Sequence, residues 1–210
     1  MKLVIIRHGE SVWNTIGRYQ GLMDPDLTER GEKQALALAR ELEKEELKIL
    51  YFSPLLRTRR TAEIIANLLS IPAVEDKRII EIDHGKWSGM LVEEVKQKFP
   101  GEFRRWMERP HESDFEGGES LQMVFQRVKD FLEEVGSKHR GESVGVVSHT
   151  VPIRCLLCAI LDVDLSRFWS FGCDNASYSV VYFEESRRVL QRLNITCHLG
   201  DLYVEAHEAL

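Results

Sequence analysis

Residues 3–11 read Leu3-Val4-Ile5-Ile6-Arg7-His8-Gly9-Glu10-Ser11, an apolar run that ends in a cation, an imidazole and a glycine. The apolar run predicts a fully buried strand, and Gly9 predicts a sharp turn where that strand ends. In open α/β sheets, ligands bind at the carboxyl edge of the strands. We therefore expect Arg7 to attract an anion to this edge and the neutral imidazole of His8 to attack it.

The rest of the chain alternates between apolar runs and helical patterns. Strands are expected at residues 49–52 and 144–147, with a short strand or extended piece at 78–81 and a hairpin of 178–183 with 189–195 across 184–188. Helices are expected from an N-cap at Thr28 to about residue 47, from Ser53-Pro54 to about 69, from 120 to about 139, and from about Thr150. This order predicts a three-layer α/β/α fold with a mostly parallel sheet and a small helical cap.

We expect a single domain over residues 1–210. Residues 91 to about 116 should form short helices with a loop. The segment of about 84–117 is polar, carries Pro100 and Pro110 and separates two core elements, so we expect it to cap the site. The tail of about 196–210 carries Cys197, Leu199 and Tyr203 and is too apolar to hang free. It is expected to pack back on the domain or to join a dimer contact.

Composition and charge narrow the class of protein. The chain is 43% hydrophobic and 30% charged, as in an ordinary globular protein. Its net charge of −6 argues against nucleic acid as a partner. No apolar run approaches the roughly 20 residues that cross a membrane, and no signal peptide precedes the first strand. We therefore expect a cytoplasmic protein without a membrane partner.

Cys155 and Cys158 form a C-x-x-C pair, which is also typical of redox or metal sites. Both lie inside an apolar helical stretch rather than at a helix start, where the dipole would activate a thiol. We expect buried core thiols. Trp87, Trp106 and Trp169 are likewise interpreted as packing residues.

Reactive side chains follow three of the expected strands. Arg7 and His8 end the first, Arg57 follows the second, and His149 ends the third. Because parallel strands end at the same edge, these residues should converge there. Two guanidiniums can clamp a phosphate ester, while one imidazole attacks phosphorus and the other stabilises the transition state.

The leaving oxygen of a phosphate ester needs a proton. Glu81 ends a short apolar piece, and partial burial would raise its pKa enough for it to act as general acid and then general base. Asp83 is the competing carboxylate.

The sequence resembles the histidine phosphatase superfamily, which has the phosphoglycerate mutase-like fold. The resemblance covers nearly the whole chain in order. It rests on Arg7-His8-Gly9-Glu10-Ser11, Trp13-Asn14, Leu27-Thr28-Glu29-Arg30-Gly31, Ser53-Pro54-Leu55-Leu56-Arg57-Thr58, Thr61-Ala62, Glu81 with Asp83-His84-Gly85, Gly117-Gly118-Glu119-Ser120, Val147-Ser148-His149-Thr150 and Asn175-Ala176-Ser177.

The resemblance implies a role for each matching residue. His8 is expected to be the phosphorylated nucleophile, Glu81 the proton donor and acceptor, and Arg7, Arg57 and His149 the phosphate pocket. The substrate-binding residues are expected to be Ser11, Asn14, Gln20, Gly21, His84 and Thr150. The resemblance implies no metal, no cofactor and a homodimer.

Within the superfamily, the chain resembles most the metal-independent phosphoserine phosphatases, through Arg18-Tyr19-Gln20-Gly21, Trp169-Ser170-Phe171-Gly172-Cys173-Asp174-Asn175 and Leu193-Asn194-Ile195-Thr196-Cys197-His198-Leu199-Gly200. We expect a small phosphorylated metabolite as substrate, with L-phosphoserine first, and a role in serine biosynthesis. His84 would donate a hydrogen bond to the substrate carboxylate.

Four alternatives stay open at this stage. The first two are phosphoglycerate mutase activity, although residues 91–116 are short for a mutase cap, and hydrolysis of a bulkier ester such as α-ribazole phosphate. A phosphate-ester-binding protein without turnover is a third. A metallohydrolase is a fourth, disfavoured because Arg7 and Arg57 would repel a metal cation.

Overall fold

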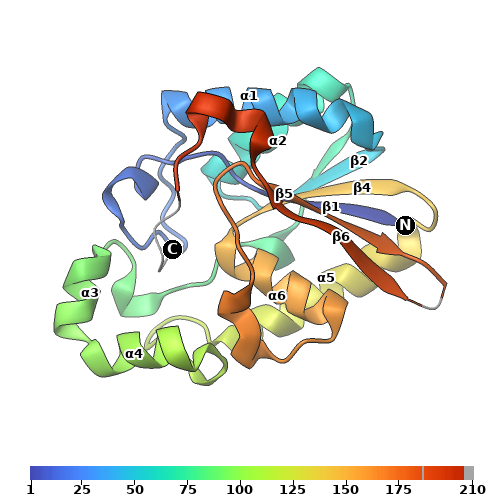
Figure 1. Cartoon of the computed structure of the whole chain (residues 1–210). Coiled ribbons are helices and arrows are strands. Elements are labelled where there is room, and N and C mark those ends of the chain that lie inside the picture. Colours follow the sequence, from blue (N-terminus) through green and yellow to red (C-terminus); the bar gives the residue numbers. More distant parts are fainter. Residues whose placement is uncertain (186, 206–210) are drawn as a thin grey trace.

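The computed structural model describes residues 1–185 and 187–205 and contains one six-stranded sheet, ordered β3-β2-β4-β1-β5-β6 (Figure 1). Its strands are β1 (Lys2–Arg7), β2 (Ile49–Phe52), β3 (Ala73–Glu75), β4 (Ser143–Ser148), β5 (Tyr178–Phe183) and β6 (Arg188–Ile195). The four strands from β3 to β1 run parallel, and β5 and β6 run antiparallel to their neighbours. The predicted, mostly parallel sheet is confirmed.

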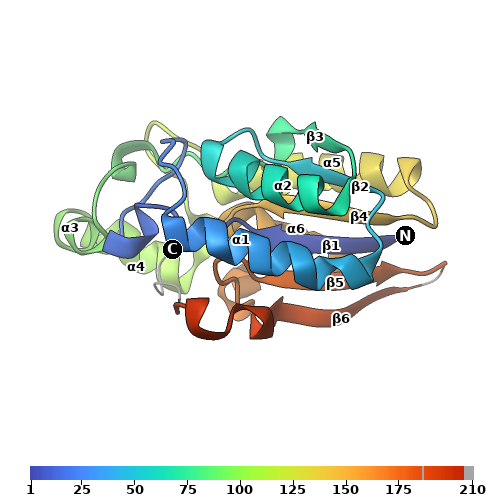
Figure 2. The same cartoon turned by 90° about the horizontal axis from the view of Figure 1, so that it is seen from above.

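Helices cover both faces of the sheet and make three layers (Figures 1 and 2). The helices are α1 (Glu29–Glu41), α2 (Leu56–Leu69), α3 (Val92–Lys98), α4 (Pro100–Glu108), α5 (Leu121–Lys138) and α6 (Thr150–Leu161). In Figure 1, α1 and α2 lie above the sheet and α5 and α6 below it, whereas α3 and α4 lie beyond the carboxyl ends of the parallel strands.

The apolar run in β1 is continuous because both of its faces are buried. Leu3 and Ile5 pack in the cluster that α5 and α6 share, while Val4 and Ile6 pack in the cluster under α1 and α2. Parallel strands covered on both sides show this pattern instead of polar alternation.

Two helix starts test the predicted capping. Thr28 is the N-cap of α1, and its hydroxyl accepts a hydrogen bond from the Gly31 N–H at 2.9 Å, as predicted. The predicted helical start at Ser53-Pro54 is wrong, because α2 begins at Leu56. Pro54 precedes that helix, and the carboxylate of Asp24 accepts the hydrogen bond from the Leu56 N–H instead. Remote loops therefore contribute to helix ends that local sequence does not show.

The predicted helix to residue 47 also ends earlier. It stops at Glu41, passes through a 3₁₀ turn at Leu42–Glu45, and Glu46 then takes a left-handed conformation with φ of 51°. The left-handed residue ends the helical segment, and the chain then continues into β2.

The short strand or extended piece predicted at 78–81 is a 3₁₀ turn at Lys77–Ile79 followed by extended backbone at Ile80. The sequence analysis missed β3, whose three residues are all exposed at the edge of the sheet. A fully exposed edge strand lacks the pattern of buried apolar residues that marks a strand in the sequence.

Residues 84–117 form 3₁₀ turns at Gly85–Trp87 and Pro110–Glu112 with α3 and α4 between them. Although the surface of this segment is polar, its interior is aromatic. Trp87, Trp106 and Phe115 are buried together, with the Phe115 ring centroid 4.9 Å from that of Trp87 and 5.2 Å from that of Trp106.

The end of the chain returns to α1. A 3₁₀ segment at Cys197–Leu202 buries Leu199, and the Gln34 side-chain amide donates to the Leu202 carbonyl at 2.9 Å. Residues 206–210 of the predicted tail, and Ser186 of the predicted hairpin turn, lie outside the described residues.

Cys155 and Cys158 are buried and unpaired, as expected of core thiols. No helix in the described part of the chain is long and apolar enough to cross a membrane.

The loop after β1 touches the first turn of α1 backbone to backbone. A Cβ at Gly31 would lie 2.1 Å from the Glu10 carbonyl oxygen, so we expect Gly31→Ala to lower the free energy of unfolding by at least about 2 kcal/mol. Gly136 in α5 offers a matched control, because its Cβ would meet only a methionine methyl at 3.9 Å. Gly136→Ala should stabilise by about 0.5–1 kcal/mol. Urea unfolding measures both, and equal effects would contradict the backbone contact.

Candidate active site

A pocket opens at the carboxyl edge of the parallel strands, where ligands bind in open α/β sheets. Its walls are Arg7, His8, Asn14, Tyr19, Gln20, Gly21, Arg57, Glu81, His84, Trp106, Thr150, Val151 and Trp169. Nine of the eleven predicted site residues line it. The other two do not line the pocket but contact residues that do: Ser11 is hydrogen-bonded to Asn14 and Gln20, and the His149 ring lies against that of His8.

The two histidines follow separate strands and lie beside each other at the carboxyl edge of the sheet. His8 follows β1 and His149 is the N-cap of α6, and their ring centroids lie 5.2 Å apart. His8 Nδ1 lies 2.7 Å from the Gly9 carbonyl, which assigns the proton to Nδ1 and leaves the lone pair on Nε2. His149 Nε2 lies 2.7 Å from Ser53 Oγ, so a Ser53 hydroxyl that donates there would leave Nδ1–H as a donor.

Both histidines are held neutral. Burial lowers the pKa of His8 well below its usual value, and Arg57 and Arg7 lower it further. Burial and Arg57 lower the pKa of His149 in the same way. A neutral His8 is the form that can act as a nucleophile.

The guanidiniums of Arg7 and Arg57 are buried and are fixed by backbone carbonyls. Arg7 Nη1 donates to the Cys173 carbonyl at 2.6 Å, while Arg57 donates to Met23 at 2.9 Å and Gly21 at 3.1 Å. Among the described residues neither arginine forms an ion pair within 4 Å, and the Nε of each has no hydrogen-bond partner. Two buried guanidiniums without an ion-pair partner make this pocket a candidate anion site.

Glu81 supplies the acid of the site. Its carboxylate accepts hydrogen bonds from the Ile82 N–H at 3.0 Å and the Val151 N–H at 3.3 Å. Burial raises its pKa, against the opposing effect of Arg57. Arg127 of α5 fixes the backbone here by donating to the Glu81 carbonyl at 3.2 Å and to Glu119 at 3.1 Å. Asp83, the competing carboxylate, does not line the pocket; its carboxylate accepts from the Gly85 N–H.

His84 lies among aromatic rings on the pocket wall. Its ring centroid is 4.9 Å from those of Tyr19 and Phe115, and burial lowers its pKa to about 3. The imidazole is therefore neutral at physiological pH.

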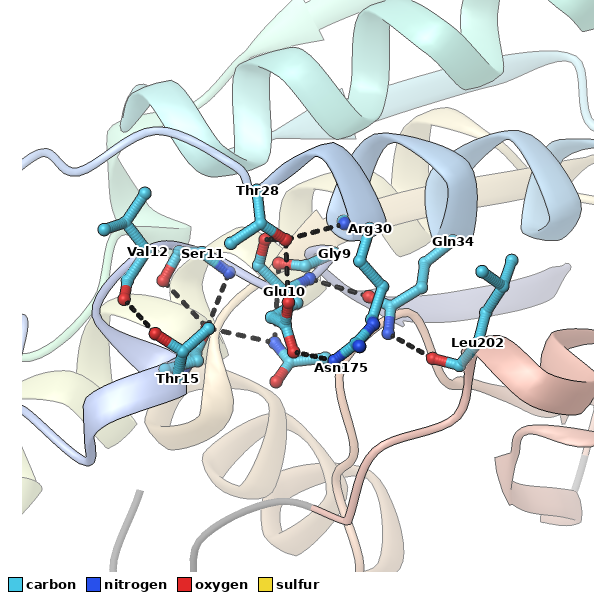
Figure 3. Close-up of polar contacts among 12 residues, drawn as sticks. Gly9, Glu10, Ser11, Val12, Thr15, Thr28, Arg30, Gln34, Asn175 and Leu202 are labelled. Atoms are coloured by element: carbon cyan, nitrogen blue, oxygen red, sulfur yellow. Dashed lines mark hydrogen bonds and ion pairs between the residues drawn. The ribbon is translucent and has the colours of Figure 1, made fainter.

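Ser11 supports the site from behind. Its Oγ lies 2.8 Å from Asn14 Oδ1 and 3.0 Å from Gln20 Oε1, so it orients two residues of the wall (Figure 3 shows the Ser11 loop). Asn175, to which sequence analysis gave no role, donates to the His8 carbonyl at 3.2 Å and to Asn14 at 3.3 Å. It ties the loop after β1 to the segment before β5.

A model of the histidine phosphatase superfamily (branch 1) matches residues 3–196. The chain belongs to this superfamily. Phosphoserine phosphatase 1 of Hydrogenobacter thermophilus is 61% identical over 210 residues and covers all of both chains. A metal-independent phosphoserine phosphatase of Arabidopsis thaliana is 32% identical over 204 residues, 96% of this chain and 84% of the relative.

Solved structures agree. A mutant phosphoserine phosphatase of Entamoeba histolytica in complex with phosphoserine superposes with a TM-score of 0.85 at 27% identity, covering 94% of this chain and 98% of that one. The phosphoglycerate mutase-like architecture of this histidine phosphatase follows from these matches and from its sheet.

Four residues of the pocket wall were missed as site residues: Tyr19, Trp106, Val151 and Trp169. Trp106 and Trp169 do pack as predicted, with the Trp169 Nε1 donating to the Trp106 carbonyl at 2.7 Å, but they also face the pocket. The sequence offered one sign of the two tryptophans' role: Trp106 is a large aromatic residue within the polar segment 84–117, and Trp169 is another beyond it.

His84 should make the stability of this histidine phosphatase depend on pH. Unfolded His84 titrates near 6.5 and folded His84 near 3, so the unfolded state binds more protons between these values and stability falls as the pH drops. We expect His84→Gln to flatten that slope by up to about 1.4 kcal/mol per pH unit. Urea unfolding of both proteins from pH 7 to pH 4 measures it. Parallel curves for the two proteins would contradict the buried neutral state of His84.

Proposed function

We propose that this histidine phosphatase hydrolyses small phosphomonoesters through a phosphohistidine at His8, with L-phosphoserine as its substrate. One observation carries the mechanism: a neutral His8, with its Nε2 lone pair free, lies beside two buried guanidiniums that form no ion pair with any residue the structure describes. The family and the phosphoserine phosphatases among its relatives support the reaction class and the substrate.

The first half-reaction transfers the phosphoryl group to the enzyme. Arg7 and Arg57 hold the non-bridging oxygens, with the Thr150 backbone and Asn14 at the rim. His8 Nε2 attacks phosphorus as the bond to the ester oxygen breaks, and His149 stabilises the charge on the equatorial oxygens. Protonated Glu81 gives its proton to the leaving oxygen, which departs as the alcohol.

The second half-reaction restores the enzyme. The Glu81 carboxylate takes a proton from water as the water oxygen attacks phosphorus and the bond to His8 Nε2 breaks. Inorganic phosphate leaves, with His8 neutral and Glu81 protonated as at the start. The chain's own side chains supply every proton and charge, and Arg7 and Arg57 would repel a divalent cation. We therefore propose metal-independent turnover.

Two features favour L-phosphoserine as the substrate: the neutral His84 side chain and the acidic residues beside the pocket. Neutral His84 on the wall can donate to the carboxylate of phosphoserine. A mutase would need further cations for a second phosphate. The adjoining hollow shares Arg7 but also carries Glu10, Glu93 and Glu205, which disfavours a bisphosphate.

We also propose a cap over the pocket, a homodimer and a physiological role for this enzyme. Residues 84–117 act as a cap, because they bring His84 and Trp106 to the pocket wall. The free edge of β6 offers a surface for a homodimer, which light scattering would test. Production of serine in the cytoplasm is the physiological role that a phosphoserine phosphatase would serve.

Purified protein should release phosphate from L-phosphoserine with chelator present. His8→Ala should remove both turnover and the acid-labile, base-stable phosphate that wild type traps from labelled substrate. Labelled phosphate retained by His8→Ala would contradict His8 as the nucleophile. Activity lost in chelator and restored by metal would contradict the metal-independent reaction.

Glu81→Gln should distinguish esters by their leaving group. We expect turnover of L-phosphoserine to fall by about 10²–10⁴-fold, because its alkoxide must be protonated as it leaves. The phosphoryl transfer step with 4-nitrophenyl phosphate should fall much less, since nitrophenolate leaves without a proton. Rapid-quench measurement of the first turnover makes the comparison. An equal loss for both esters would show that Glu81 does not act as the acid.

A further inference from the structure

Three polar atoms on one side of the pocket have no hydrogen-bond partner among the described residues: Tyr19 OH, His84 Nδ1 and Trp106 Nε1. Their residues all line the pocket and are buried, with exposed fractions of 0%, 5% and 1%. Buried hydroxyls and N–H groups in folded proteins are nearly always bonded, and each exception requires an explanation.

These three residues form one cluster. The His84 ring centroid lies 4.9 Å from that of Tyr19 and 6.3 Å from that of Trp106, with the Phe115 ring against both His84 and Trp106. The guanidiniums of Arg7 and Arg57 line the same pocket and are held by the carbonyls of Cys173, Gly21 and Met23. The pocket wall therefore combines two guanidiniums, its arginine part, with three neutral donor groups.

Some comparable buried groups are bonded: the Tyr51 hydroxyl lies 2.9 Å from His139 Nε2, and the Trp169 Nε1 donates to the Trp106 carbonyl. Others, such as His111 Nδ1 and Ser113 Oγ, also lack a partner among the described residues, but they do not line the pocket. An unmade hydrogen bond costs stability, so three in one pocket indicate that a ligand completes them.

All three groups can act as donors, which defines the chemistry of that ligand. Phenol and indole donate, and a neutral imidazole donates from whichever nitrogen carries its proton. A carboxylate has about four lone-pair sites on two oxygens and can accept several donors at once. Neutral donors suit the single charge of a carboxylate better than a phosphate dianion. The guanidiniums of Arg7 and Arg57 already offer positive charge to the phosphate.

We propose that Tyr19 and Trp106 join His84 in a carboxylate subsite, in which the phenol O–H and the indole N–H donate to the carboxylate of the substrate. This inference rests on the proposed function for the presence of a phosphoryl group in the arginine part. It adds that the enzyme selects phosphomonoesters that carry a carboxylate a few bonds from the ester oxygen.

Tyr19→Phe tests the subsite by removing one oxygen atom. We expect kcat/KM for O-phospho-L-serine to fall by about 10- to 100-fold, the value of one hydrogen bond to a charged group. O-phosphoethanolamine is the same ester without the carboxylate, and its kcat/KM should change much less. Trp106→Phe should shift the ratio of the two substrates in the same direction.

Tyr51→Phe is the matched control, since its hydroxyl is bonded and lies outside the pocket. It should lose stability and keep wild-type kinetics on both substrates. Tyr19→Phe should keep or gain stability, because the hydroxyl it loses has no partner. This opposite pattern separates a ligand contact from a structural role.

Two results would overturn the subsite: an equal loss of kcat/KM for both substrates in Tyr19→Phe, or no loss for either. Failure of wild type to hydrolyse O-phospho-L-serine would instead overturn the proposed substrate. The comparison of 3-phosphoglycerate with glycerol 3-phosphate, which lacks the carboxylate, would then decide the subsite independently.

Discussion

Two buried guanidiniums, which form no ion pair in the described part of the chain, govern this site. Arg7 and Arg57 are removed from water, yet their nearest fixed partners are backbone carbonyls, which offset part of the lost hydration but none of the charge. Their field lowers the pKa of His8 and opposes the burial that raises the pKa of Glu81. A dianionic phosphoryl group suits such a site, because its charge would offset the repulsion between the two guanidiniums.

The sheet makes that arrangement possible by bringing distant segments to one edge. β1, β2 and β4 are parallel neighbours, so the residues that follow them meet although about 140 positions separate His8 from His149. Around this edge the backbone is held closely. Gly9 and Gly31 allow the β1 loop to lie against α1, and Arg127 fixes the carbonyl that precedes Ile82. The acid and the nucleophile are thereby positioned before any ligand arrives.

The sequence alone predicted the parts of the site that stand on buried strands. The apolar residues before His8 and His149 mark those strands clearly, and Arg57 follows a third. The prediction from sequence missed β3, whose exposed residues have no apolar pattern. It also placed Pro54 inside a helix that begins at Leu56, where the Asp24 carboxylate accepts a hydrogen bond from the Leu56 N–H. The shared position of Tyr19 and Trp106 on the pocket wall could not be predicted for a different reason. Eighty-seven positions separate them, and only the folded chain shows that both end on one wall with an unbonded polar atom.

The buried side chain of Gln34 connects two places that are far apart in the chain (Figure 3). Its oxygen accepts from the Glu10 N–H, two residues beyond His8, at 2.8 Å, while its nitrogen donates to the Leu202 carbonyl. A single amide thus anchors the nucleophile loop and the C-terminal segment together. Displacement of the C-terminal segment would therefore remove one of the two backbone groups that hold Gln34 against the loop that follows His8.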